Sequence, residues 1–334
     1  MLALLFGIAA VITIARLHAA GIVVADAITL FLIAGILLAA ALMVGTNWVE
    51  KWPAAASLAE LFPRLIRGLP GAEDGFHPNA GAGALLVFLP SALQAAASRA
   101  WPARLRLVGR VAAVMIGFVL ILTQSRGAIA GMTLGTALTA ALIAPGRTRR
   151  RLQSVTAVAA TVALIGLILL FAAPARLERI AGPHLVEGLS SRIELWDRTA
   201  SEIWDHRWSG LGFNGFRNQI QAEQPLFLFE PSDRPPHAHN ALLQTAADLG
   251  LAGLAIYLML LVMVTVDLAR IAKAGAAIST RAAAAALLAG WLAHLSFGLA
   301  DAIPLGTKVG LVFWLTVGLA AVLVADDQSH ARVV

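Results

Sequence analysis

Long apolar runs, separated by short polar segments, make up most of this 334-residue chain. A helix that crosses the hydrocarbon core of a bilayer needs about 20 mainly apolar residues, and the runs have that scale. We therefore predict an all-α, polytopic membrane protein with about nine transmembrane helices embedded in the lipid bilayer. The predicted spans are residues 1–16, 19–44, 79–98, 105–122, 124–144, 153–173, 240–266, 282–300 and 303–325.

Basic residues gather in three of the segments between these runs. Cytoplasmic loops carry an excess of Lys and Arg, so we expect these three segments to lie in the cytoplasm. They contain Arg99, Arg104, Arg106 and Arg110; Arg147, Arg149, Arg150 and Arg151; and Arg270, Lys273 and Arg281. By alternation, the segments expected on the outer side are residues 45–78, 123–126, 174–239 and 300–304.

The alternation divides the chain into three parts. Residues 1–173 are predicted to form N-terminal transmembrane helices, residues 174–239 a helical outer loop domain, and residues 240–334 three transmembrane helices with a short cytoplasmic tail. The first run is short and has no basic flank before it, which favours a missing upstream helix over a cleaved signal peptide. Asp301 and Lys308 flank the last outer turn and are predicted to anchor it at the interface.

Charge and cysteine content narrow the function classes. The chain has 25 Lys and Arg against 19 Asp and Glu, a formal net charge of +6. Because the excess lies in the predicted cytoplasmic loops, it is an orientation signal, and we expect no nucleic-acid partner. The absence of Cys excludes disulfides, Cys-based zinc sites and thiol nucleophiles.

Two histidines mark the point where the large outer loop re-enters the membrane. His237 and His239 follow Pro235 and Pro236, which disfavour helix, and an apolar run starts after Asn240. Both are therefore predicted to lie at the water boundary, at the start of a helix that runs unbroken to Gly250. Histidine can exchange protons near neutral pH; the alternative is a solvated or capping residue. His237 is expected to be the more mobile because it adjoins the prolines.

Two arginines on other outer segments are candidate ligands for an anion. Arg126 lies in the TQSRGA hairpin, where an arginine at the edge of hydrocarbon normally faces a protein interior or a watery cavity; the alternative is snorkelling to the headgroups. Arg192 is predicted in the opening turn of a helix capped by Ser190 or Ser191. A planar guanidinium fork suits phosphate.

A glycine-rich segment lies further along the chain, at Gly210–Phe216. It has too many glycines for a regular helix, so we predict a loop whose backbone comes close to another part of the molecule.

These segments resemble the O-antigen ligase and polymerase superfamily of bacterial membrane glycosyltransferases, and most of all its ligases. The ligase signature is His, then Asn, Ser or Gln, nine residues, Gly, two residues and Gly, and it is met from His239 to Gly253. The Ser125–Gly127 hairpin, Arg192 with Trp196, and the HPNA segment at His77 also resemble the family. The resemblance covers about residues 75–325.

The resemblance implies transfer of a glycan from an undecaprenyl diphosphate carrier to an acceptor hydroxyl, at the periplasmic face of the bacterial inner membrane. The implied acceptor is lipid A–core. Polymerisation of repeat units and glycan transfer to protein remain alternatives within the class. Transport of a small anion is an alternative of another class, which binds its substrate at the membrane midplane; Asp26, inside the second predicted span, would suit it.

The resemblance also implies roles for single residues. Arg126 and Arg192 would hold the diphosphate, while His239 would take the acceptor proton as a general base. Asn240 is expected to cap the helix or to orient His239. No Asp-x-Asp pair lies on an outer segment, so we expect metal-independent transfer without a cofactor. The further expected substrate contacts are His237, Arg217, Arg234 and Asn240.

Overall fold

The computed structural model describes residues 5, 7–9, 11, 12, 21, 23–46, 48, 49, 51–55, 75–146, 183–213, 215–229 and 235–331. Every regular element in these ranges is helical, as the long apolar runs predict. The predicted span 153–173, most of the span 1–16, and Arg234 lie outside the described residues.

Six helices of the described residues are long and apolar enough to cross a membrane. A bent pair, α5 (Pro78–Leu85) and α6 (Leu89–Ala97), makes a seventh span if its 42° bend is counted as one broken crossing. Pro90 explains the bend, because it has no N–H with which to continue the hydrogen bonds of α5. The predicted count of nine is therefore met in part. The six helices are α2 (Val24–Gly45), α7 (Ala103–Thr123), α8 (Arg126–Ile143), α13 (Ala241–Ala274), α14 (Ile278–Gly298) and α15 (Leu311–Ala331).

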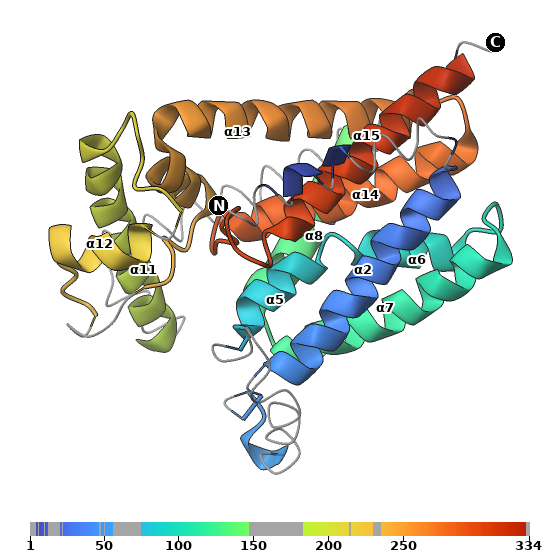
Figure 1. Cartoon of the computed structure of the whole chain (residues 1–334). Coiled ribbons are helices and arrows are strands. Elements are labelled where there is room, and N and C mark those ends of the chain that lie inside the picture. The colour runs from blue at the N-terminus through green and yellow to red at the C-terminus, as the bar shows by residue number, and fades with distance from the viewer. Residues whose placement is uncertain are drawn as a thin grey trace. The chain divides into compact units, whose positions relative to one another are not determined.

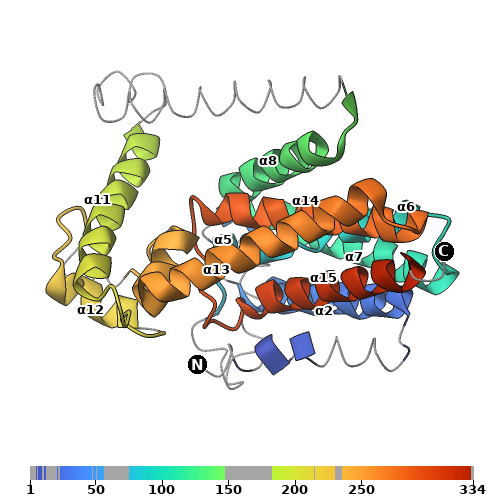
Figure 2. The same cartoon turned by 90° about the horizontal axis from the view of Figure 1, so that it is seen from above.

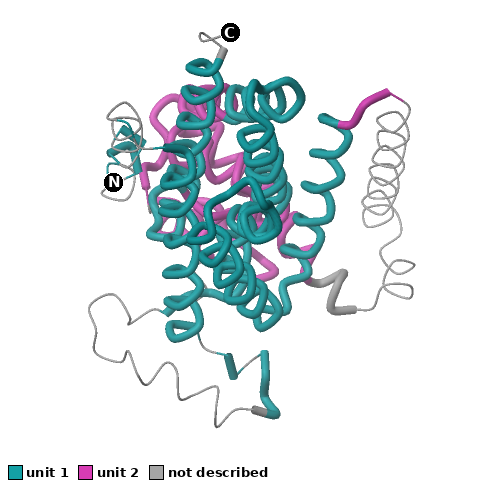
Figure 3. Tube along the Cα trace, turned by 90° about the vertical axis from the view of Figure 1, so that its right-hand side faces the viewer, with its two compact units in different colours: residues 1–143, 261–297, 305–334 teal, residues 144–260, 298–304 magenta. Residues whose placement is uncertain are grey.

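The chain divides into two compact units, coloured separately in Figure 3. Unit 1 comprises residues 1–143, 261–297 and 305–334, and unit 2 comprises residues 144–260 and 298–304. Helix α13 begins in unit 2 and continues along the chain into unit 1.

Unit 1 is a bundle of apolar helices that approach one another closely. In it α7 packs against α2 and α6 (Figure 1), and α15 runs beside α2 (Figure 2). On α8, a Cβ at Gly135 would lie 2.2 Å from the backbone nitrogen of Ala293 on α14. The two backbones therefore nearly touch, the close packing that small residues permit between membrane helices.

Contacts at the two ends of unit 1 agree with the predicted alternation. At one end, Arg104 forms an ion pair with Asp26 at 2.6 Å. At the other end, Nε1 of Trp52, just before the 3-10 turn η1 (Pro53–Ala55), donates to the carbonyl of Leu122 at 2.9 Å. The prediction for Asp26 is corrected: α2 starts at Val24, so Asp26 lies in the first turn and is not a lone midplane charge.

Unit 2 contains α11 (Pro183–Asp205), α12 (Gly215–Glu223) and the first part of α13. The start predicted for α11 is wrong. Proline is favoured at the first position of a helix, and the helix begins at Pro183, so Arg192 lies in its middle. Ser191 is no cap, because its Oγ donates to the carbonyl of Gly188 at 3.3 Å. The core of the unit is formed by Leu195, Phe216, Ile220, Leu226, Ala238 and Ala247.

Helix α13 runs unbroken up to Gly250, as predicted, and breaks there, which corrects the prediction of one continuous span over residues 240–266. Gly250 has φ 70° and ψ −177°, a conformation that only glycine adopts easily. The chain after α11 lies in the break: the N–H of Leu251 donates to the carbonyl of Arg207 at 2.8 Å. A Cβ at Gly250 would lie 2.8 Å from that carbonyl oxygen. The Gly-rich segment packs here too, since a Cβ at Gly210 would lie 2.5 Å from the carbonyl oxygen of Asp248, which confirms its predicted close approach.

Candidate active site

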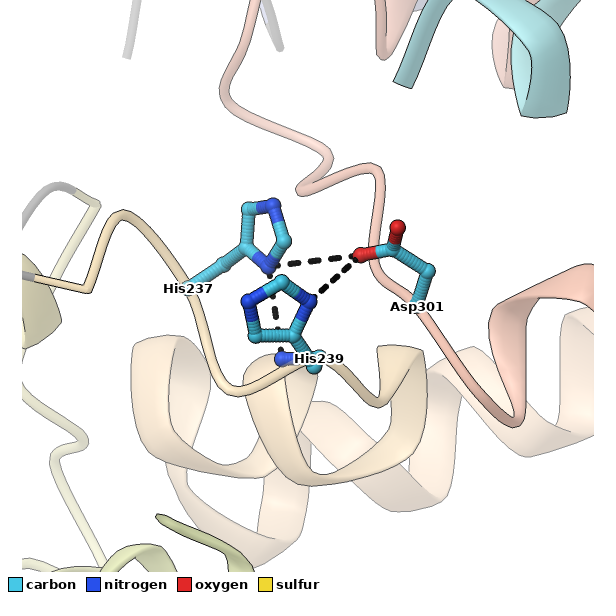
Figure 4. A group of neighbouring side chains, drawn as sticks. All are labelled: His237, His239 and Asp301. Atoms are coloured by element: carbon cyan, nitrogen blue, oxygen red, sulfur yellow. Dashed lines mark hydrogen bonds and ion pairs between the residues drawn. The ribbon is translucent and has the colours of Figure 1, made fainter. Parts of the chain in front are cut away.

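The two predicted histidines meet an aspartate from a distant part of the chain (Figure 4). Nδ1 of His239 lies 2.9 Å from Oδ1 of Asp301, and Nδ1 of His237 lies 3.7 Å from the same oxygen. All three residues belong to unit 2. Asp301 is only 5% exposed. The prediction that it anchors the turn at the interface is therefore wrong: it is a buried partner of the histidines.

Asn240 fixes the start of α13 and confirms the predicted cap. Its Oδ1 accepts hydrogen bonds from the N–H groups of Leu242 at 2.9 Å and Leu243 at 3.1 Å, which satisfies two donors that an uncapped helix leaves without partners. Its Nδ2 donates to the carbonyl of Leu299 at 3.1 Å. The same side chain thus joins the histidine loop to the turn that carries Asp301.

Ala238, the residue between the two histidines, anchors their loop in the core of unit 2. Ala238 is fully buried, and its N–H donates to Oε1 of Gln244 at 2.8 Å. Nε2 of Gln244 in turn donates to Oδ1 of Asp248 at 2.8 Å. Because Ala238 is held in the core, its two neighbours are presented together, with their rings 4.5 Å apart in an edge-to-face arrangement.

The backbone of His239 adopts a conformation that is uncommon outside glycine. Its φ is 48°, in the left-handed region that His, Asn and Asp enter more readily than other residues. The N–H of His239 donates to Nδ1 of His237 at 3.3 Å, which helps to hold this turn. His237 accepts this bond and lies against the ring of His239, and its greater mobility stays a prediction. Unusual backbone conformations of this kind concentrate at functional sites.

The contact with Asp301 selects a protonation form for His239. A carboxylate accepts, so Nδ1 of His239 carries the hydrogen and donates it, which leaves Nε2 of the neutral ring with a lone pair. An aspartate in this position orients the imidazole and stabilises the imidazolium that forms when Nε2 takes a proton. This geometry would allow Nε2 to accept a proton from a bound molecule.

Asp301 is equipped to remain ionised in this buried position. Burial alone raises the pKa of its carboxyl. The hydrogen bond from His239, the charges that His239 and His237 carry when protonated, and the N–H of Ala302 together outweigh burial, so the pKa of Asp301 lies below its ordinary value. The carboxylate is therefore present at any pH at which the histidine can act as a base.

Arg126 begins α8, in the hairpin that the sequence predicts. Ser125 caps the helix, its Oγ accepting from the N–H of Ala128 at 3.3 Å. The side chain of Arg126 is exposed. A helix N-terminus carries partial positive charge, so Arg126 adds a full charge where an anion is already favoured. Arg126 belongs to unit 1.

The other predicted arginines do not join the histidines directly. Arg192 is half-buried on α11 and Arg217 is exposed on α12. Both lie in unit 2, and among the described residues neither forms a hydrogen bond or ion pair with His237, His239 or Asp301. The structure thus brings together the histidines and Asn240 from the predicted site residues.

Sequence reasoning missed Asp301 and Gln244 as parts of the site. A signal for Asp301 was present: it is an acidic residue in a very short turn between two apolar spans, and such residues are usually paired. It also falls on the same predicted side of the membrane as His239. Gln244 gave no signal, because a glutamine one turn into a helix is ordinary.

Comparison with known families gives one match. A family model described as O-antigen ligase matches residues 111–258. Over this segment the chain is similar to the O-antigen ligase superfamily. The match contains both histidines, Arg126, Arg192 and the Gly250 break, and it ends before Asp301. No curated protein shows significant similarity to the chain. The O-antigen ligase superfamily comprises membrane glycosyltransferase-like enzymes, which agrees with the several apolar helices of this chain.

Proposed function

We propose that this protein transfers a glycan from an undecaprenyl diphosphate carrier to an acceptor hydroxyl at the periplasmic face of the inner membrane, ligating O-antigen to lipid A–core. The observation that carries the proposal is the hydrogen bond between His239 and buried Asp301 just before α13. The match of residues 111–258 to the O-antigen ligase family model supports glycan transfer in lipopolysaccharide or polysaccharide synthesis.

His239 acts on the acceptor in this proposal. Its Nε2 removes the hydroxyl proton while the acceptor oxygen forms a bond to the anomeric carbon of the donor glycan. The bond between that carbon and the carrier oxygen breaks, and the electron pair leaves with the diphosphate. Asp301 stabilises the imidazolium during this step. A diphosphate is weakly basic, so its departure needs charge stabilisation more than a strong acid.

Arginines supply that charge stabilisation. Arg126 at the N-terminus of α8 and Arg192 on α11 each present a guanidinium with no hydrogen bond or ion pair among the described residues. A guanidinium fork can neutralise phosphate charge without a divalent ion, so we propose metal-independent transfer. Arg217, Arg234 and His237 remain proposed substrate contacts. The side chain of Asn240 forms hydrogen bonds with the start of α13 and with the carbonyl of Leu299, so we propose that it positions the site.

Replacing Arg126 or Arg192 by Lys is expected to damage transfer nearly as much as replacement by Ala. Lysine keeps the charge but loses the planar pair of donors that matches a phosphate. Losing a bidentate contact to a charged group lowers the rate by on the order of 10- to 100-fold. The measurement is the rate of transfer from carrier-linked donor by each purified variant.

The matched control for these variants is Arg104→Lys. Arg104 pairs with Asp26 near the start of α2, and lysine can keep that exposed ion pair, so transfer should be unchanged. Full activity of Arg126→Lys and Arg192→Lys, at normal expression, would instead show that both arginines only anchor the chain at the headgroups.

Deleting the gene in its natural host is expected to remove all capped lipopolysaccharide bands while polymer accumulates on the lipid carrier. Ligation is the last step before a finished polymer reaches lipid A–core, so its loss leaves the polymer on the carrier. The measurement is a lipopolysaccharide gel combined with analysis of carrier-linked glycan.

Complementation provides the control for the deletion. The wild-type gene should restore the ladder, whereas His239→Asn should not. Lipopolysaccharide carrying a single repeat unit in the deletion strain would point to polymerisation, and an unchanged ladder would refute a role in lipopolysaccharide assembly.

A further inference from the structure

A second cluster of titratable side chains lies in unit 2, apart from the histidine loop in sequence. Glu202 on α11 and His206 just after it are four residues apart, so they lie on the same side of the helix. Glu223 at the end of α12 completes the cluster. Nε2 of His206 lies 3.4 Å from Oε1 of Glu202 and 3.4 Å from Oε2 of Glu223. The ligand atoms of all three lie within 4.8 Å of one another.

Glu202 is the unusual member of the cluster. Its side chain is 0% exposed, and neither carboxylate oxygen has a hydrogen-bond partner. A buried carboxylate that accepts no hydrogen bond is strongly disfavoured. Burial and repulsion by Glu223 raise the pKa of Glu202, while the charge of His206 opposes the rise. The side chains around Glu202 therefore do not fully compensate the negative charge of its carboxylate, and a further positive group would stabilise it.

The spacing of the three ligand atoms fits a metal ion better than it fits hydrogen bonds. A separation of 3.4 Å is long for an N–H···O bond, which is normally about 2.7–3.2 Å. Histidine nitrogen and carboxylate oxygen each lie about 2.0–2.2 Å from Zn²⁺, and two such atoms at tetrahedral angles are about 3.3–3.6 Å apart. Two of the three separations already have that value.

We propose that Glu202, His206 and Glu223 bind a divalent transition-metal ion, of which Zn²⁺ fits best. One imidazole nitrogen and two carboxylate oxygens form a three-ligand set that leaves a fourth position to water. His206 and Glu223 are partly exposed, at 36% and 46% of their side chains, so the ion can enter from solvent. The bound ion satisfies the oxygens of Glu202 and links α11 to α12. This site is independent of the proposed transfer chemistry.

The test uses the purified full-length protein in detergent, stripped of metal by a chelator and titrated with Zn²⁺ in a calorimeter. His237, His239 and Asp301 also form a group that could hold a metal ion, so every titration is done in the His239→Asn background. We expect one equivalent of Zn²⁺ to bind in that background. Adding Glu202→Gln or His206→Asn should weaken binding by about tenfold or more, because each removes one of the three ligands.

A stability measurement and a matched control complete the test. Zn²⁺ should raise the melting temperature of the His239→Asn protein but not of the Glu202→Gln double variant. His330→Asn is the control, because His330 also faces an acidic residue four positions away, at 3.6 Å from Asp326, and its loss should not change Zn²⁺ binding. If Glu202→Gln fails to fold, Glu223→Gln at the exposed ligand gives the same comparison.

Two results would overturn the proposal. One is the absence of stoichiometric Zn²⁺ binding in the His239→Asn protein. The other is binding that Glu202→Gln, His206→Asn and Glu223→Gln all leave unchanged. Neither result would bear on glycan transfer, which is measured separately.

Discussion

Replacing His239 by Asn is expected to reduce glycan transfer by on the order of 10²- to 10⁴-fold, the usual contribution of a general base. Asparagine is chosen because it tolerates the left-handed backbone that His239 adopts, with φ 48°. The variant therefore removes the imidazole while adding little backbone strain. The protein should remain folded and in the membrane, which size-exclusion chromatography and a melting curve can verify.

The neighbouring histidine provides the comparison. His237→Asn should keep measurable activity, because the Oδ1 of Asn can still accept the hydrogen bond that the N–H of His239 now donates to His237. His330→Asn, on the last turn of α15, should have wild-type activity. Robust turnover by His239→Asn would remove this residue from the mechanism.

Replacing Asp301 by Asn is expected to be the second most damaging change, with a loss of about 10²- to 10⁴-fold in kcat. An amide has no negative charge to stabilise the imidazolium, and its NH₂ group can donate to Nδ1 and so select the wrong tautomer of His239. The KM for the carrier-linked donor should change little, since Asp301 is buried and contacts histidine rather than substrate. A large rise in KM with unchanged kcat would contradict this role.

Stability should also report the charge of Asp301. The pKa of Asp301 lies below its ordinary value of 3.8, so the ionised carboxylate stabilises the folded protein above that pH, and this contribution is lost as the pH falls through the lowered pKa. Asp301→Asn should therefore melt below the wild type at neutral pH, and the difference should close in strong acid. Equal melting temperatures at neutral pH would show that the hydrogen bond with His239 contributes no stability.

The large features of the fold follow from the sequence because membrane spans are simple physical objects. A run of apolar residues such as 105–122 must be helical in hydrocarbon, where every backbone N–H and C=O needs a partner within its own segment. The basic loops predict which helix ends lie on the same side of the membrane. The hydrogen bond from Trp52 to Leu122 joins two residues that are predicted on the same side. The break at Gly250 did not follow, because glycine is common inside membrane helices and the loop that fills the break comes from elsewhere in the chain.

Only part of the candidate site could be predicted from the sequence. His239 and its cap Asn240 are local features, readable from prolines, polarity and the spacing to Gly250. Asp301 lies 62 residues further along, and pairing it with His239 requires the tertiary arrangement of unit 2. The same limit applies to α11, where the two serines gave a plausible cap but Pro183 starts the helix earlier.

The most direct test of the central claim, that His239 held by Asp301 is the base, is the pH dependence of kcat/KM for the purified protein with carrier-linked donor and lipid A–core acceptor. The lowered pKa of Asp301 keeps that group ionised between about pH 5 and 8, so Asp301 does not titrate in this range. We expect kcat/KM to rise with pH, because a general base must have a free lone pair on Nε2, and we expect His239→Asn to lack this rise. A rate that falls with rising pH in the wild type would contradict the account, because it would make His239 a cationic contact for the diphosphate.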